Sequence, residues 1–364
     1  MMGCTRRPEG NSPDGCRRGI LLYIPQEVVY QAGVMSPDPE PPQPQPPSSP
    51  IVPATSGDGK LLIVALRCGR LANRLALFAN LIAFAEEHGH RVINFTFHSY
   101  AALFEATRRD VFCRYPAATR PSWLDAIPGV GGAIRKTRIF YHAVRGLSVL
   151  NEKLPVFGNK MVTLREGPGH QLVILLETPE IQARIAEAKV VFVYGFIFRA
   201  PAAMQRHAEK IRAYFQPIEK HGRASRQAVD CMRQSADVVV GVHIRRGDYI
   251  GWARGKYFFP VSQYAAWMRE LAEQFPGRKV SFLVCSNEPR TAQEFTGLSV
   301  GFAAGSPVED LYALAGCDYV VGPVSSFTQW ASFYGGKPLL HLRDSKDRIE
   351  REKFRVSYLE EVPH

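Results

Sequence analysis

Residues His243–Tyr249 read HIRRGDY and follow the apolar run Val238–Val242 without a break. A β-branched run that ends in two adjacent arginines predicts a buried strand that delivers two fixed positive charges to a loop. Arginine stays ionised, and its planar guanidinium matches phosphate. Ligands of open α/β sheets bind at the carboxyl ends of the strands. We therefore expect Arg245 and Arg246 to lie in an anion-binding site.

Asp248 leaves a structural alternative open. Its carboxylate could neutralise the arginines and make the group an ion pair with no ligand. We favour a ligand, because adjacent guanidinium groups repel each other unless an anion lies near them.

Strand and helix patterns alternate on both sides of this stretch. Strands are expected at 61–66, 92–97, 172–176, 190–198, 237–244, 279–285, 299–302, 318–321 and 338–342. Helices are expected at 71–87, 128–150, 201–214, 217–234, 261–275, 290–296, 307–315 and 326–334. The alternation predicts two α/β domains, residues 58–216 and 217–364, whose mostly parallel sheets carry helices on both faces. We expect the site in the cleft between them.

The amino-terminal residues 1–57 are expected to be disordered, because proline alternates with polar residues over 36–53. We expect a cytoplasmic protein, since the sequence contains no signal-peptide core and no apolar stretch of about 20 residues. Residues 128–150 mix apolar and basic side chains. Such a helix can contact the inner face of an anionic membrane, but we favour an ordinary helix with a solvated face.

The chain carries a net charge of +11. This charge suits nucleotides, phosphates, anionic membranes or nucleic acid. Nucleic acid is not the expected partner, because the arginines are spread along the chain. Seven cysteines without a C-x-x-C pair predict neither a disulfide framework nor a zinc site. The sequence also lacks the D-x-D, H-E-x-x-H and P-loop motifs, so we expect no metal ion and no P-loop ATPase.

Three loops of the second domain should meet at the carboxyl ends of its strands. The first carries the arginines, the second is Cys285–Glu288 with Ser286, and the third is Pro323–Thr328 with Ser325 and Ser326. The third loop enters a helix, whose free N–H groups can bind an anion. One of its hydroxyls is expected to act only as a helix cap.

The residues resemble a known family at several points. HIRRGDY resembles the H-x-R-R-G-D-Y signature of the alpha-1,2-fucosyltransferases of glycosyltransferase family 11. Residues Gly69–Arg74 (GRLANR) are similar to the family's G-R-L-G-N-Q, and Tyr194–Phe196 is similar to its G-Y-W-Q segment. The family's later motifs are matched by Ile211, Arg212, Phe215, Glu309, Asp310, Leu311, Cys317, Ser325, Ser326, Phe327 and Trp330.

The resemblance implies a GT-B fold and metal-independent, inverting transfer of L-fucose from GDP-fucose to a glycan hydroxyl. It implies that Arg245 holds the β-phosphate of GDP and that Arg246 and Asp248 fix the loop or contact the donor. Asn73 would face the donor from the first domain. Because they lie on the converging loops, Ser286, Ser325 and Ser326 are also expected to bind the donor.

Departures from the family pattern leave alternatives open. Arg74 stands where the family has glutamine and should add a charge at the cleft. The catalytic base could be Asp248, a first-domain acid such as Glu105, or absent. The chain could use another nucleotide sugar, or it could bind a nucleotide sugar without turnover.

Overall fold

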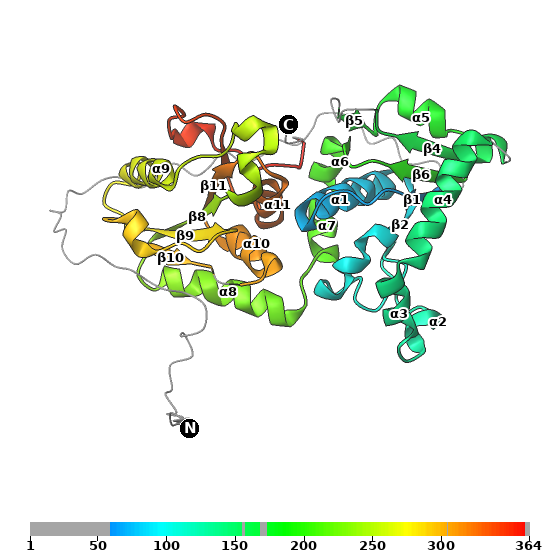
Figure 1. Cartoon of the computed structure of the whole chain (residues 1–364), viewed down its shortest axis with the longest axis horizontal. Coiled ribbons are helices and arrows are strands. Elements are labelled where there is room, and N and C mark those ends of the chain that lie inside the picture. The colour runs from blue at the N-terminus through cyan, green and yellow to red at the C-terminus, as the bar shows by residue number, and fades with distance from the viewer. Residues whose placement is uncertain (1–58, 155–156, 168–172, 304, 361–364) are drawn as a thin grey trace, which may run out of the picture.

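The computed structural model describes residues 59–154, 157–167, 173–303 and 305–360 as two α/β domains lying side by side (Figure 1). The predicted disordered extension lies outside the described residues. The predicted boundary between residues 216 and 217 falls between the last helix of the first domain and the first helix of the second, and it stays a prediction.

The first domain is built on a five-stranded sheet in the order β3-β2-β1-β6-β4. Its strands are β1 (Leu61–Val64), β2 (Arg91–Ile93), β3 (Arg114–Tyr115), β4 (Met161–Arg165) and β6 (Val190–Tyr194). Only β3 runs antiparallel to its neighbour. A small parallel pair joins β5 (Ile174–Leu175) to β7 (Phe198–Arg199). The helices are α1 (Leu71–His88), α2 (Trp123–Ala126), α3 (Val130–Thr137), α4 (Ile139–Lys153), α5 (Pro179–Ile185), α6 (Pro201–Arg206) and α7 (Ala208–Tyr214).

The second domain holds an all-parallel sheet in the order β10-β9-β8-β11-β12. Its strands are β8 (Val238–Ile244), β9 (Val280–Ser286), β10 (Val300–Phe302), β11 (Tyr319–Pro323) and β12 (Leu339–Leu342). Its helices are α8 (Glu219–Arg233), α9 (Val261–Glu273), α10 (Pro307–Gly316) and α11 (Ser326–Gly335). Every residue of the central strand β8 is buried, which explains its continuous apolar run.

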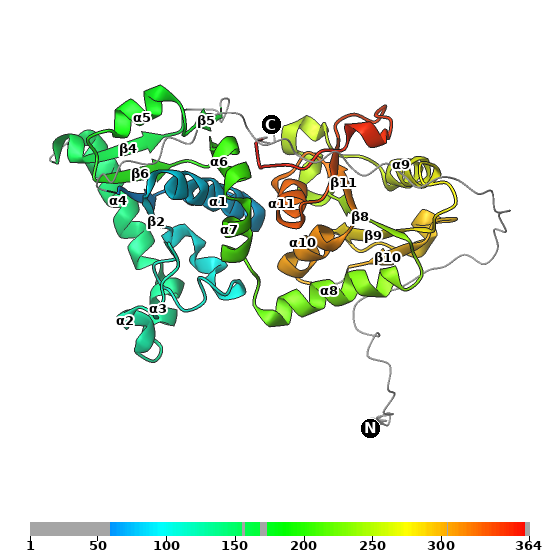
Figure 2. The same ribbon diagram turned by 180° about the vertical axis from the view of Figure 1, so that it is seen from behind.

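Helix α1 is buried along most of its length because it has partners on both sides. It lies between the first sheet and α11 of the second domain, as Figures 1 and 2 show. Its apolar side chains join those of α10 and α11 in one cluster that spans both domains. The first turn of α1 is thereby held at the cleft.

The two-domain α/β architecture confirms the predicted fold class, but several local predictions were wrong. Residues Phe95–Ser99 form a 3-10 helix and not the end of a strand. The single helix expected over 128–150 is α3 and α4, which meet at Arg138 in a left-handed conformation with φ of 57°. The helix expected at 290–296 is one 3-10 turn, Ala292–Phe295, and strands β3 and β4 were not expected.

Candidate active site

A cleft of about 880 Å³ lies between the domains, at the carboxyl ends of β8, β9 and β11. The first domain contributes the loop before α1, the first turn of α1 and Phe196, and the second contributes the loops after the three strands. The cleft is lined by Gly69, Arg70, Leu71, Ala72, Asn73, Phe196, His243, Arg245, Asp248, Tyr249, Trp252, Cys285, Ser286, Asn287, Pro307, Asp310, Ser325, Ser326 and Phe327. Five of the six predicted donor-binding residues therefore meet in it.

Arg245 and Asp248 form a paired charge in the wall of the cleft. The Arg245 guanidinium donates from Nε to Oδ1 of Asp248 at 2.8 Å and from Nη2 to Oδ2 at 2.6 Å. Arg70 of the first domain reaches the same carboxylate, with Nη2 3.9 Å from Oδ2. The hydrogen bonds from Arg245 lower the pKa of Asp248. Asp248 therefore remains ionised at neutral pH and fixes the guanidinium plane of Arg245.

Arg246 is the one predicted donor-binding residue that does not line the cleft. Its Nη1 donates to the carbonyl of Phe259 at 3.1 Å, and its Nε lies 3.4 Å from Oε2 of Glu288. Its guanidinium also stacks on the ring of Phe258. These contacts support a structural role in the loop, and donor contact by Arg246 stays a prediction.

The loop after β9 holds the backbone of the arginine loop in place. Asn287 Oδ1 accepts from the Arg246 N–H at 3.0 Å, and Glu288 Oε1 accepts from the Gly247 N–H at 3.0 Å. Ser286 lines the cleft, and its hydroxyl accepts from the Glu288 N–H at 3.2 Å. The two loops therefore form one hydrogen-bonded unit behind Arg245.

The amino terminus of α11 opens onto the same cleft. Ser325 caps the helix, because its hydroxyl accepts from the N–H of Thr328 at 3.1 Å. This confirms the expectation that one hydroxyl of this loop acts as a cap. The Ser326 hydroxyl donates to Oδ1 of Asn73 in the first domain. Ser326 and Phe327, in the first turn of α11, line the cleft, and the free N–H groups of a helix's first turn favour an anion nearby.

His243 lies at the end of β8 and is buried, with its ring stacked on Phe327 at 4.7 Å between centroids. Burial, aided by the charge of Arg245, lowers the pKa of His243 to about 3. The imidazole is therefore neutral and adds no charge to the cleft. Its position supports a packing role.

Asp310 lines the cleft, whereas the sequence analysis matched it to a family motif without giving it a role. It lies in the first turn of α10, where its Oδ1 accepts from the N–H of Gly305 at 3.2 Å. Burial raises the pKa of Asp310 to about 7. A carboxyl group with such a pKa in a cleft is a typical mark of a functional residue. An acid in the first turn of a helix is common, so the sequence alone does not show that Asp310 is buried in the cleft.

Two first-domain residues do not reach the cleft. Arg74 was expected to add a charge there, but it is buried and its Nη1 donates to the carbonyl of Thr96 at 2.9 Å. Its Nε and Nη2 donate to the carbonyl of Gly69, so it supports the loop from behind. Glu105 pairs with Arg108 at 2.8 Å, away from the cleft lining.

In the part of the chain that the structure describes, no three histidine, cysteine, aspartate or glutamate side chains gather as a metal-ion site. Within the same residues, no helix has the length and apolar character needed to cross a bilayer.

Residues 185–354 match the model of glycosyl transferase family 11. Over these residues the chain is similar to glycosyl transferase family 11. The match covers β6, α6, α7 and almost all of the second domain, including the loops that carry Arg245 and Ser325. The family resemblance read from HIRRGDY is thus confirmed.

Curated relatives support the assignment. The family 11-like chain is 30% identical to galactoside alpha-(1,2)-fucosyltransferase 2 of Mus musculus over 112 residues, which are 28% of this chain and 32% of that protein. It is 31% identical to galactoside alpha-(1,2)-fucosyltransferase 1 of Saimiri sciureus over 112 residues, 28% of this chain and 30% of that one. The matched segment thus spans about a third of these relatives.

The fold is shared with a solved structure of Arabidopsis thaliana FUT1 in complex with GDP. The two align with a TM-score of 0.50 at 13% identity, covering 82% of this chain and 73% of that chain. The family 11-like chain accordingly has a fold of GT-B type, as expected.

Proposed function

We propose that this chain is a glycosyltransferase that moves L-fucose from GDP-fucose to a hydroxyl of a glycan acceptor, with inversion and without a metal ion. Its action would resemble that of a galactoside 2-alpha-L-fucosyltransferase. The observation that carries the proposal is the joint lining of one interdomain cleft by Arg245 and the amino terminus of α11. The family match and the alpha-(1,2)-fucosyltransferase relatives support the choice of fucose.

The two groups supply what a departing diphosphate needs. Arg245 provides a charged fork that Asp248 already orients, and α11 provides backbone N–H groups and the Ser326 hydroxyl. Such preorganised donors stabilise charge as it develops on a leaving group. These groups support neutralisation of the β-phosphate without a divalent ion.

The proposed reaction is a single in-line displacement. The acceptor oxygen bonds to the anomeric carbon while the bond from that carbon to the β-phosphate oxygen breaks, and GDP leaves from the opposite face. The transition state is oxocarbenium-like, and the acceptor proton passes to a base or to water. Among the bases considered from the sequence, Glu105 lies outside the cleft lining and Asp248 has a lowered pKa. We therefore assign Asp248 mainly to the orientation of Arg245.

Asp310 supports guanine as the base of the donor. The edge of guanine offers two adjacent N–H donors, at N1 and N2, and an ionised carboxylate is a pure acceptor with two oxygens. Asp310 is the cleft carboxyl group that is not tied to Arg245. Uracil and thymine present only one N–H, so such a contact would select GDP over UDP and dTDP.

Two alternatives remain distinguishable by ligand binding. A transferase for another nucleotide sugar would prefer a different nucleotide. A binding protein without turnover would bind GDP-fucose but release no GDP in the presence of galactoside acceptors.

The test is titration calorimetry of the full chain with GDP, GDP-fucose, UDP, UDP-glucose and dTDP-glucose, each with and without EDTA. We expect heat from GDP and GDP-fucose alone, unchanged by EDTA. Preference for UDP or dTDP compounds would overturn the donor assignment, and loss of binding in EDTA would overturn metal independence. Release of GDP from GDP-fucose on addition of a β-galactoside would then establish transfer.

A further inference from the structure

Helix α4 carries isoleucine and leucine side chains that the fold leaves exposed. Its buried residues are Tyr141, Ser148 and Asn151, and Phe140 packs on Phe95 and Phe112. Two of the three buried residues are polar, and Asn151 donates to the carbonyl of Met161 in β4 at 2.9 Å. The large aliphatic residues of the helix point elsewhere.

The exposed apolar residues of α4 form one stripe. Ile139, Ala143, Leu147, Leu150 and Leu154 follow one another every three or four residues, which places them on one helix face. We call this set the α4 stripe. Ile139, Leu150 and Leu154 are 58%, 51% and 58% exposed, and Phe157 just beyond the helix is 52% exposed. Solitary exposed leucines are common, but a continuous stripe normally marks a contact surface.

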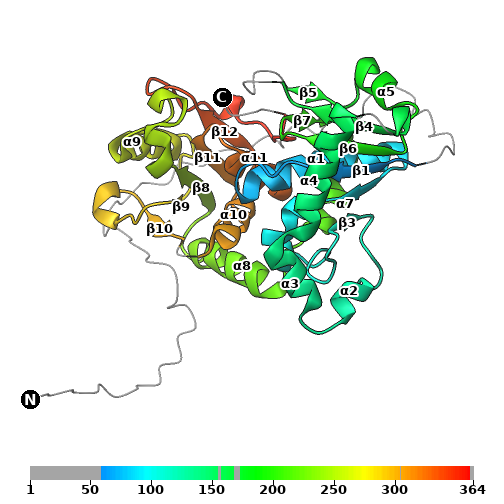
Figure 3. The ribbon, with the colours of Figure 1, turned by 45° about the vertical axis from the view of Figure 1, so that its right-hand side comes forward.

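The stripe lies on the outside of the molecule. Figures 1 and 2 show α4 along the outer edge of the first domain, on the side away from the second domain, and Figure 3 brings it to the front. It is separate from the cleft, whose lining contains no residue of α4. The stripe is therefore accessible without any change in the active site.

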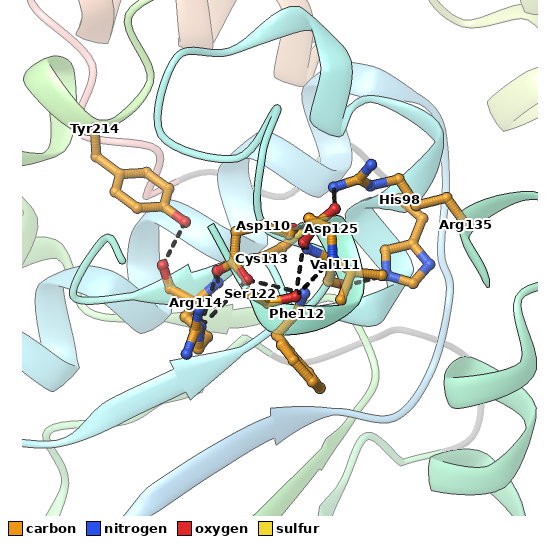
Figure 4. Close-up of polar contacts among 10 residues, drawn as sticks. All are labelled: His98, Asp110, Val111, Phe112, Cys113, Arg114, Ser122, Asp125, Arg135 and Tyr214. Carbon is orange, nitrogen blue, oxygen red and sulfur yellow. Dashed lines mark hydrogen bonds and ion pairs between the residues drawn. The ribbon is translucent and has the colours of Figure 1, made fainter. Parts of the chain in front are cut away.

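The charge around the stripe is strongly positive. Residues 126–160 contain six basic residues, Arg135, Lys136, Arg138, Arg145, Lys153 and Lys160, and a single acid, Glu152. Glu152 is paired with Arg165, and Arg135 is neutralised by Asp125 at 2.6 Å, in the polar network drawn in Figure 4. Lys136, Lys153 and Lys160 have no acidic partner among the described residues. The region thus combines exposed aliphatic side chains with lysines that have no acidic partner among the described residues.

We propose that the α4 stripe docks this chain on the surface of an anionic lipid bilayer. Leucine and isoleucine side chains would enter the boundary between headgroups and acyl chains, while the lysines at both ends of α4 would contact anionic headgroups. The basic residues around the α4 stripe favour an anionic bilayer over a second copy of the chain, because two such positive surfaces would repel each other. The anchored helix lies in the membrane plane and does not cross it.

The experiment is flotation of the full chain with vesicles of phosphatidylcholine alone or of phosphatidylcholine mixed with phosphatidylglycerol. We expect flotation with the mixed vesicles and little with phosphatidylcholine. The change L147S/L150S should weaken binding at least about 10-fold, because two aliphatic anchors are lost. The change K136A/K153A/K160A should weaken it comparably and reduce its salt dependence. L175S is the matched control, since Leu175 is an exposed leucine of β5 and should leave binding unchanged.

Thermal unfolding shows whether each variant is folded, and light scattering shows whether the chain is a monomer or a dimer. Failure of the full chain to float with mixed vesicles, or full flotation of L147S/L150S with an unchanged melting temperature, would overturn the proposal. A dimer that L147S/L150S converts to a monomer would show that a second copy covers the stripe, which also overturns it. Nucleotide binding should be the same in all these variants, so the result does not depend on the proposed function.

Discussion

Asn73 and Ser326 join the two domains across the cleft, the amide oxygen of the first accepting a hydrogen bond from the hydroxyl of the second. Asn73 stands in the first turn of α1, and Ser326 is the first residue of α11. Both helices present their amino termini to the same space, where a diphosphate would be stabilised. Under the proposed function, Asn73 would lie beside the phosphates of the donor.

A charge introduced at Asn73 should report on this geometry. The change N73D places a carboxylate next to the amino terminus of α11, where it would repel a diphosphate. We expect GDP affinity to fall at least about 10-fold, more at low salt than at high salt. Calorimetry at two ionic strengths measures the effect. If N73D binds GDP as tightly as the parent chain at low salt, Asn73 does not face the phosphates.

Replacement of Arg245 tests the leaving-group role. R245A should lower kcat/KM by about 100- to 1,000-fold, the usual loss for one preorganised donor of a developing anion. R245K keeps the charge but loses the fork, so it should recover only part of the rate. R269A is the control, because Arg269 is an exposed arginine of α9 outside the cleft. Unchanged turnover in a folded R245A protein would exclude the diphosphate role.

Asp248 can be tested as an orienting residue or as a base. The change D248N leaves one acceptor where Arg245 now finds two, so the guanidinium should shift and kcat/KM should fall about 100-fold or less. The pH dependence of kcat near neutrality should persist, because the lowered pKa of Asp248 keeps it ionised there. Loss of the acidic limb of the pH–rate profile in D248N would instead identify Asp248 as the base.

Asp310 should make the free protein less stable as pH rises. Its pKa is about 7 in the folded chain against an ordinary value of 3.8. Between these values the folded state holds a proton that the unfolded state has lost, so the free energy of unfolding falls as pH increases. D310N should remove that fall, and at about pH 8 it should melt at a higher temperature than the parent chain. An identical pH dependence of melting in both proteins would show that Asp310 is not perturbed.

The affinity for GDP should also depend on the ionisation of Asp310. It should rise with pH, whereas the stability of the free protein should fall. If the ionised Asp310 accepts from N1 and N2 of guanine, GDP affinity of the parent chain should increase as pH rises through about 7. D310N should bind GDP weakly and with little pH dependence, and inosine diphosphate, which lacks the N2 amino group, should bind the parent chain more weakly than GDP. Equal affinities for the two nucleotides would argue against this contact.

The sequence predicted the elements that are set by local pattern. Strand β8 was expected at 237–244 and spans Val238–Ile244, because a fully buried parallel strand needs an unbroken apolar run. The site residues on loops after such strands followed from the same rule, which is why Arg245, Ser286 and Ser325 all reached the cleft.

The features that the sequence could not predict depend on contacts between residues far apart in the chain. Arg74 turns inward because the carbonyls of Gly69 and Thr96 lie behind the loop. The break at Arg138 requires a left-handed residue, and arginine carries no signal for one. Helical periodicity predicted that 128–150 is amphipathic. It could not predict that the leucines would be exposed to solvent while Ser148 and Asn151 would be buried.

The core shared by the two domains has a consequence for folding. Phe215 of the first domain packs edge-on against Trp330 at 5.1 Å, and its carbonyl accepts from the buried Tyr312 hydroxyl at 2.6 Å. The helices α10 and α11 thus bury apolar side chains against α1, which precedes the family-matched residues 185–354. We therefore expect the two halves to unfold as one cooperative unit. A fragment limited to the matched residues would expose that face and aggregate, and the whole chain should melt in a single transition.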